Sequence, residues 1–76
     1  MKNDMIFGEM ILYSKDWISP NGKYYVKVRR FKADYPDIDV IHKVFVGERK
    51  KYIRHRDLPQ YVKEQIELMR QEAINF

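Results

Sequence analysis

The side chains that could perform catalysis or bind a metal are few and widely separated in this sequence. The only imidazoles are His42 and His55, and no Ser/His/Asp set or His-x-x-x-His spacing includes either of them. Cysteine is absent, which excludes disulfides and thiolate-bound zinc. The sequence therefore predicts a protein that is not an enzyme, with no catalytic residue, no metal site and no cofactor.

An acidic group around Pro36 is the nearest approach to a cation site. It consists of Asp34, Asp37 and Asp39. A calcium-binding loop needs a longer series of ligands, with a glycine and a closing glutamate, and this segment has neither. Because aspartate also favours turns, turn formation is the simpler interpretation.

The stronger functional signal is the distribution of positive charge. Residues 1–56 carry 13 Lys and Arg against 7 Asp and Glu, a net charge of +6, whereas residues 57–76 carry 2 against 4, a net charge of −2. The cations form two clusters along the chain. The first comprises Lys23, Lys27, Arg29, Arg30 and Lys32. The second comprises Arg49, Lys50, Lys51, Arg54 and Arg56.

Cations interleaved with aromatic residues favour a nucleic-acid-binding surface. Lys and Arg neutralise phosphates and release counterions, while flat aromatic rings stack on bases. A strand can also enter the major groove of duplex DNA, where Arg reads guanine. The alternative interpretation is that these cations only solvate an exposed sheet face and discourage edge pairing.

The chain that positions these groups is short and forms a single domain over residues 1–76. A domain of this size has no room for a deep enclosed site. Hydrophobic residues make up 45% of the chain, so a packed core is expected despite 34% charged residues. No apolar run approaches the roughly 20 residues of a membrane helix, and no secretion signal is present, so a cytoplasmic location without membrane association is expected. The richness in Lys, Ile, Tyr and Asn indicates an AT-rich genome and hence a bacterial or phage source.

The first expected element is a strand over residues 6–18, with Ile11 and Tyr13 on one face. The following Ser19-Pro20-Asn21-Gly22 is typical of a hairpin tip, because Pro presets φ and Asn and Gly tolerate positive φ. A two- or four-residue loop would place Trp17 on the inward face of the next strand, and a three-residue loop would place it on the opposite face.

The second expected strand, residues 23–32, alternates more clearly. Its inward set is Tyr24, Val26 and Val28. Its outward set is Tyr25, Lys27, Arg29 and Phe31. The outward set alternates aromatic and cationic residues, so it is the first candidate contact surface.

The middle of the chain predicts a loop over residues 33–39 and a third strand over residues 40–46 that is apolar on both faces. Residues 47–50 read as a second turn. Residues 51–54 are compatible with a short edge strand, which would be a fourth strand of the sheet.

One helix is expected at the C-terminus. Asp57 and Gln60 have capping-box spacing, and Pro59 is tolerated in a first turn. Apolar residues then recur at helical spacing, at Leu58, Val62, Ile66, Met69 and Ala73. The predicted fold is therefore α+β, with a three-stranded antiparallel sheet, or a four-stranded one, packed on a single helix in the order β-β-β-α. The helix is expected to cover one sheet face and leave the other free.

The order of these elements is similar to that of the small arm-binding domains of tyrosine recombinases. The shared features are a turn followed by a strand such as Lys23-Tyr24-Tyr25-Val26-Lys27-Val28, a second basic turn, and a helix. This resemblance extends over about fifty residues and concerns architecture alone. It implies a three-stranded sheet that lies against DNA. It assigns no residue roles.

The leading functional hypothesis is a small non-enzymatic nucleic-acid-binding protein, with duplex DNA as the expected ligand. Base or stacking contacts are expected at Tyr25, Arg29 and Phe31. Phosphate or other nucleic-acid contacts are expected at Lys27, Arg49, Lys50, Lys51, Arg54 and Arg56.

The alternative hypothesis is a protein-interaction module, such as a phage-type inhibitor or adaptor, that docks on an acidic or nucleic-acid-binding host protein. Its distinguishing feature would be a hydrophobic patch involving Trp17, Tyr35 or Phe76 beside the charge. A homodimer formed through an exposed edge strand is compatible with either hypothesis.

Overall fold

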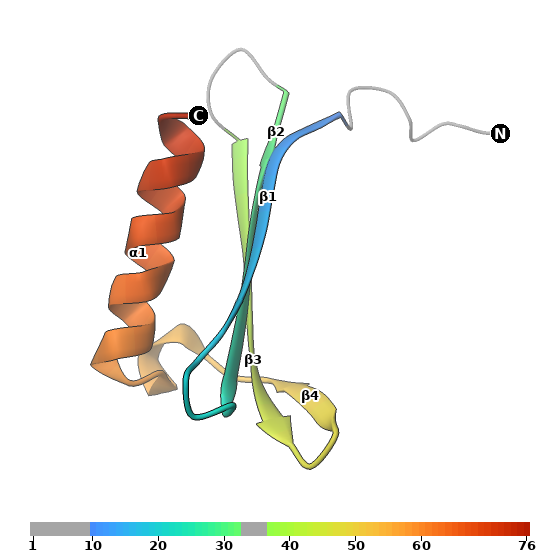
Figure 1. The fold of residues 1–76 in the computed structure, drawn as a ribbon, viewed down its shortest axis with the longest axis vertical. Helices are drawn as coiled ribbons and strands as arrows, with labels where there is room; N and C mark the ends of the chain where they lie inside the picture. The colour runs from blue at the N-terminus through green and yellow to red at the C-terminus, as the bar shows by residue number, and fades with distance from the viewer. Residues whose placement is uncertain (1–9, 33–36) are drawn as a thin grey trace, which may run out of the picture.

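The computed structural model describes residues 10–32 and 37–76. Their strands are β1 (Ile11–Ile18), β2 (Tyr24–Phe31), β3 (Asp37–Val46) and β4 (Arg49–Tyr52), followed by a short 3-10 turn, η2 (His55–Asp57), and the helix α1 (Gln60–Ile74). The strands form one antiparallel sheet in the order β1-β2-β3-β4, and α1 lies along one face of it (Figure 1). This arrangement confirms the predicted α+β fold and includes the fourth strand.

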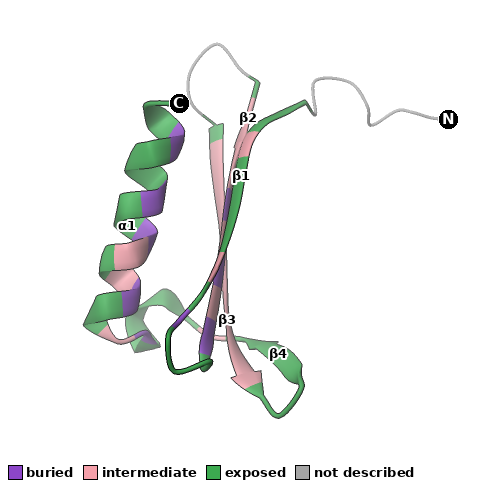
Figure 2. Ribbon diagram, in the orientation of Figure 1, coloured by how far each residue is buried: buried purple, intermediate pink, exposed green. Residues whose placement is uncertain are grey.

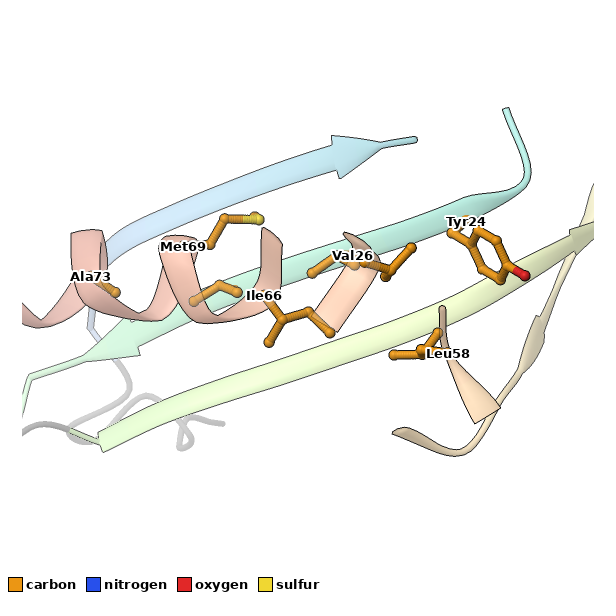
Figure 3. Close-up of a cluster of buried hydrophobic side chains, with 8 residues drawn as sticks. Tyr24, Val26, Leu58, Ile66, Met69 and Ala73 are labelled. Carbon is orange, nitrogen blue, oxygen red and sulfur yellow. The ribbon is translucent and has the colours of Figure 1, made fainter. Parts of the chain in front are cut away.

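The core lies between β2 and the inner side of α1 (Figures 2 and 3). The two predicted apolar sets meet there, because strand and helix periodicity each place one set on a single face. The buried residues are Tyr24, Val26, Val28, Leu58, Val62, Ile66, Met69 and Ala73. Since each large aliphatic side chain contributes about 1.5–3 kcal/mol when fully buried, this interface is the main source of stability.

The turn between β1 and β2 is organised by a buried serine. The Ser19 hydroxyl donates to Asn21 Oδ1 (2.6 Å) and accepts hydrogen bonds from the backbone N–H groups of Lys23 (3.1 Å) and Tyr24 (2.9 Å). Gly22 has a φ of +73°, as the turn requires. The pairing of Trp17 with Val26 shows that the four-residue loop is used, so Trp17 packs against the core.

The start of β1 departs from the predicted alternation. Ile11 pairs with Phe31 and Tyr13 pairs with Arg30. Phe31 and Arg30 are adjacent in β2, whereas Ile11 and Tyr13 are separated by one residue in β1, so β1 contains one extra residue here. This shift is a β-bulge, and it places Ile11 and Tyr13 on opposite faces of the sheet. The expectation that they share a face was wrong for this reason. Residues 6–9 of the predicted strand lie outside the described residues.

Two boundaries in the middle of the chain also differ from the prediction. β3 begins at Asp37, within the expected loop, because residues 37–39 pair in register with the end of β2. β4 begins at Arg49, two residues earlier than expected, because Val46 pairs with Arg49 and leaves a two-residue turn. Gly47 in that turn has a φ of +65°, which suits a tight hairpin.

The predicted capping box does not form. The residue that precedes α1 is Pro59, and no side chain caps the helix. Leu58 is extended, with φ −77° and ψ 145°, because a residue before proline disfavours helical geometry. Asp57 instead accepts a hydrogen bond from Arg54 Nε (3.1 Å), and Gln60 donates to Glu64. Within the described part of the chain, no helix has the length and apolar character needed to cross a membrane.

Candidate nucleic-acid interface

The sheet face that points away from α1 carries the predicted contact residues of β2. This strand alternates between buried and half-buried positions, so its odd-numbered side chains lie on the uncovered face. They are Tyr25, Lys27, Arg29 and Phe31. The cross-strand register places further residues on the same face. They are Asp39, Ile41, Lys43, Phe45, Lys50 and Tyr52.

The cations on the outward face of β2 are compensated by carboxylates of neighbouring strands. Lys27 Nζ lies 3.6 Å from a carboxylate oxygen of Asp16 on β1. Arg29 donates through Nε and Nη2 to Asp39 Oδ2 on β3, and its guanidinium lies 5.3 Å from the centre of the Phe31 ring. These two side chains are therefore already held by partners within the chain.

Arg30, the other arginine of β2, belongs to the covered side of the sheet. Its Nη1 donates to the backbone carbonyls of Ala73 (2.9 Å) and Ile74 (3.0 Å) at the end of α1. A guanidinium at this position satisfies helix carbonyls that have no partner within the helix and interacts favourably with the helix dipole. Arg30 therefore joins sheet to helix and is not part of a contact surface.

Three residues of the second basic cluster, Arg49, Lys50 and Lys51, lie on a hairpin that extends beyond α1 (Figure 1). We refer to residues 43–52 as the β3–β4 ribbon. Lys43 pairs with Tyr52 and Phe45 with Lys50 on the uncovered face. The alternate positions, Lys51 and Arg49, lie on the reverse face. All four residues of β4 are exposed, so the ribbon presents side chains to solvent on both faces.

Among the described residues, the cations of the ribbon have no carboxylate partners of the kind found on β2. Within residues 10–32 and 37–76, no carboxylate forms an ion pair with the cations of the ribbon. These cations are Lys43, Arg49, Lys50 and Lys51. The only acidic side chain of the ribbon is Glu48, at the turn. Lys50 Nζ lies 4.1 Å from the centre of the Tyr25 ring, a cation–π contact that leaves the ammonium charge uncompensated.

The predicted site residues therefore fall into separate groups. The structure brings Tyr25 and Lys50 together. Phe31 lies at the other end of β2. Arg54 is paired with Asp57 at 3.1 Å, and Arg56 is exposed in η2.

Three ribbon residues on the uncovered face were not among the contacts predicted from the sequence. They are Lys43, Phe45 and Tyr52. The signal that could have found them is the two-residue turn at Gly47, since that turn fixes which residues of β3 and β4 lie opposite one another. Among the described large hydrophobic residues, Tyr52 has the highest exposed fraction, 74%.

His42 attaches the segment after the ribbon to the sheet. Its Nδ1 lies 2.8 Å from the backbone carbonyl oxygen of Ile53. Because a carbonyl oxygen only accepts, Nδ1 carries the proton in this contact. The His42 ring also lies 5.8 Å from the ring of His55, centre to centre. Among the described residues, no group of three or more His, Cys, Asp or Glu side chains lies close enough to hold a metal ion.

The comparisons with known proteins identify no relative of this chain. No protein-family model matches it, and neither a curated protein nor a solved structure matches it.

Proposed function

We propose that this protein binds duplex DNA through the β3–β4 ribbon. The observation that carries the proposal is the presence, on both faces of the β3–β4 ribbon, of cations that no described carboxylate pairs with. The major groove of B-DNA is about 12 Å wide and admits a two-stranded β-ribbon. The two phosphate backbones border that groove, so a ribbon inserted there meets negative charge on each of its faces.

The two faces of the ribbon give its cations different roles. Lys43 and Lys50 face one backbone, and Arg49 and Lys51 face the other. Such contacts fix the position of the protein on the duplex without reading the sequence. Tyr52, which is widely exposed and lies on the same face as Lys43 and Lys50, can donate its hydroxyl to that backbone.

The proposal shifts the expected contacts from β2 toward the ribbon. Arg29 is held by Asp39, and the Tyr25 ring lies beneath Lys50, so neither group is presented freely to a base. Lys27 has a weaker constraint, since its partner Asp16 is 3.6 Å away and both side chains are partly exposed. We place these β2 residues at the margin of the interface.

Fluorescence anisotropy with labelled duplex and single-stranded oligonucleotides of the same sequence tests this function. We expect the wild-type protein to bind duplex in preference to single strands, at physiological salt as well as at low salt. The Lys50→Glu/Lys51→Glu variant should lose about tenfold or more in duplex affinity. The matched control, Lys32→Glu/Arg70→Glu, changes the net charge equally at positions distant from the ribbon and should lose much less. Equal losses in the two variants would contradict the assignment to the ribbon.

A protein-interaction module is the second candidate function, and the exposed C-terminal residue favours it. Phe76 is 72% exposed and meets Tyr13 edge-on, with ring centres 5.5 Å apart. Trp17 is half-buried against the core, and Tyr35 lies outside the described residues. Under this alternative, an acidic protein occupies the ribbon. The same anisotropy assay distinguishes the two functions, because the protein-interaction function predicts no duplex binding at physiological salt.

A further inference from the structure

Among the described strands, β1 forms one edge of the sheet, and a row of its backbone groups has no partner there. The bond from Ser19 N–H to the Tyr24 carbonyl (2.9 Å) fixes which β1 residues bond to β2. Because bonded positions alternate in an antiparallel pair, Tyr13, Lys15 and Trp17 direct their backbone groups to β2. The backbone groups of Ser14 and Asp16 therefore point outward, toward any strand that adds to this edge.

Charged side chains on an edge strand usually oppose such pairing. Here both charges of β1 are compensated within the chain. Lys15 Nζ lies 3.1 Å from Glu72 Oε1, and Asp16 lies 3.6 Å from Lys27 Nζ. The edge consequently presents no net charge to a second strand.

A strip of α1 next to this edge carries two exposed apolar side chains, Leu68 and Tyr61, with the polar Gln65 between them. Leu68 lies one helical turn before Glu72, whose carboxylate contacts β1, so Leu68 occupies the same flank. Leu68 is 54% exposed, and Tyr61, two turns before it, is 42% exposed. A strand added beside β1 would partly cover this strip as well as the edge.

We propose that two copies of this chain pair through β1, antiparallel about a two-fold axis that passes beside Lys15. The two four-stranded sheets then form one continuous sheet. Ser14 lies opposite Asp16 of the second copy, where a hydroxyl can donate to a carboxylate. Trp17 lies opposite Tyr13 of the second copy, and aromatic cross-strand pairs stabilise sheets by about 0.2–1 kcal/mol each.

The register follows from the limits of the regular part of β1. An axis beside Ser14 would extend the pairing into the bulge between Ile11 and Tyr13. An axis beside Asp16 would set two Asp16 carboxylates directly opposite each other, which is destabilising. The axis beside Lys15 avoids the bulge and sets two Lys15 side chains opposite each other. The ion pair of each Lys15 with Glu72 (3.1 Å), shorter than that of Asp16 with Lys27 (3.6 Å), offsets their repulsion.

Disulfide trapping tests this register, because the wild-type chain has no cysteine. At the axis, the two copies of residue 15 form a non-hydrogen-bonded pair with Cα atoms about 4.5 Å apart, within the range of a disulfide. The two copies of residue 14 are offset by two positions and lie beyond about 7 Å, outside that range. Lys15→Cys should therefore cross-link in mild oxidant, whereas Ser14→Cys, the matched control, should stay largely monomeric on a non-reducing gel.

Analytical ultracentrifugation of the wild-type protein and of Ser14→Pro completes the test. The Ser14 N–H points away from β2, so proline removes a bond to the second copy without removing one within the sheet. We expect a dimer for wild type and a monomer for Ser14→Pro, with unchanged circular dichroism. A wild-type protein that stays monomeric at high micromolar concentration would overturn the proposal, as would equal cross-linking of the two cysteine variants. Neither result depends on nucleic-acid binding.

Discussion

β2 and the β3–β4 ribbon are both rich in cations, but they have different surroundings. β2 is central, buried against α1 on one side, and its outward cations are held by Asp16 and Asp39. The ribbon extends past the helix, is exposed on both faces of β4, and has no described carboxylate paired with its cations. Similar local sequences therefore have different surroundings: β2 is part of the core, and the cations of β4 are exposed to solvent.

A count of charges along a chain therefore does not locate a binding surface. An exposed cation attracts phosphate strongly only where no neighbouring carboxylate already neutralises it. Cross-strand neighbours decide this, and they are distant in sequence, as Arg29 and Asp39 show.

The largest expected effect concerns stability. Met69→Ala removes a fully buried side chain from the interface between α1 and β2 and should lower the free energy of unfolding by about 2–5 kcal/mol. Tyr52→Ala on the ribbon should change it by no more than about 0.5 kcal/mol, since Tyr52 is mostly exposed. Urea denaturation measures both. A comparable loss in the two variants would mean that the ribbon is as important to the fold as β2.

A second comparison separates one cation of each region. Lys43→Glu should weaken duplex binding by about tenfold at low salt, because it removes a ribbon cation and adds repulsion. Lys27→Glu should weaken it by less than about threefold, because Lys27 is already paired with Asp16 and lies at the margin. Anisotropy titrations measure both affinities. The reverse order would place the interface on β2.

Releasing a β2 cation provides a smaller effect of opposite sign. Asp39→Asn removes the carboxylate that holds Arg29, so the guanidinium gains freedom to reach a phosphate. Duplex affinity at low salt should rise by about two- to threefold, and the gain should disappear at high salt. A fall in affinity would show that Arg29 contributes to binding only while it is paired with Asp39, and that this pairing does not withhold Arg29 from phosphate.

The smallest effect is a pH dependence on the covered side. The pKa of Glu72 is lowered by hydrogen bonds donated by Lys15 and Tyr13, so folding favours its carboxylate form. Its contribution to stability is therefore present above the ordinary pKa of 4.5 and is lost as the pH falls through the lowered value. Wild type should exceed Glu72→Gln in urea midpoint near neutral pH, and the difference should shrink in acid. A constant difference would show that Glu72 acts through packing and not through charge.

The elements were more predictable from sequence than the site. The alternation of β2 and the apolar stripe of α1 give the core, because each period places one set of residues on one face. The capping box failed because Pro59 keeps Leu58 extended and delays the helix.

Which residues lie together on the uncovered face depends on the registers between strands, and the alternation within a single strand does not determine these registers. The two-residue turn at Gly47 sets which residues of β3 and β4 lie opposite one another, and it brings Lys43 to the ribbon. The ion pairs that neutralise Lys27 and Arg29 require the registers of β1 and β3 with β2. Each register follows from a turn length or a bulge, and a one-residue change in either would reverse the faces.

The salt dependence of duplex binding shows whether the ribbon cations contact phosphates. Each phosphate contact contributes about 0.9 to the slope of log affinity against log salt concentration. This slope is negative. We therefore expect the Lys50→Glu/Lys51→Glu variant to show a slope that is shallower than that of wild type by about two. The Lys32→Glu/Arg70→Glu control should retain the wild-type slope. Unchanged slopes in both variants, or an equal reduction in both, would show that the ribbon does not hold the phosphates and would contradict the account.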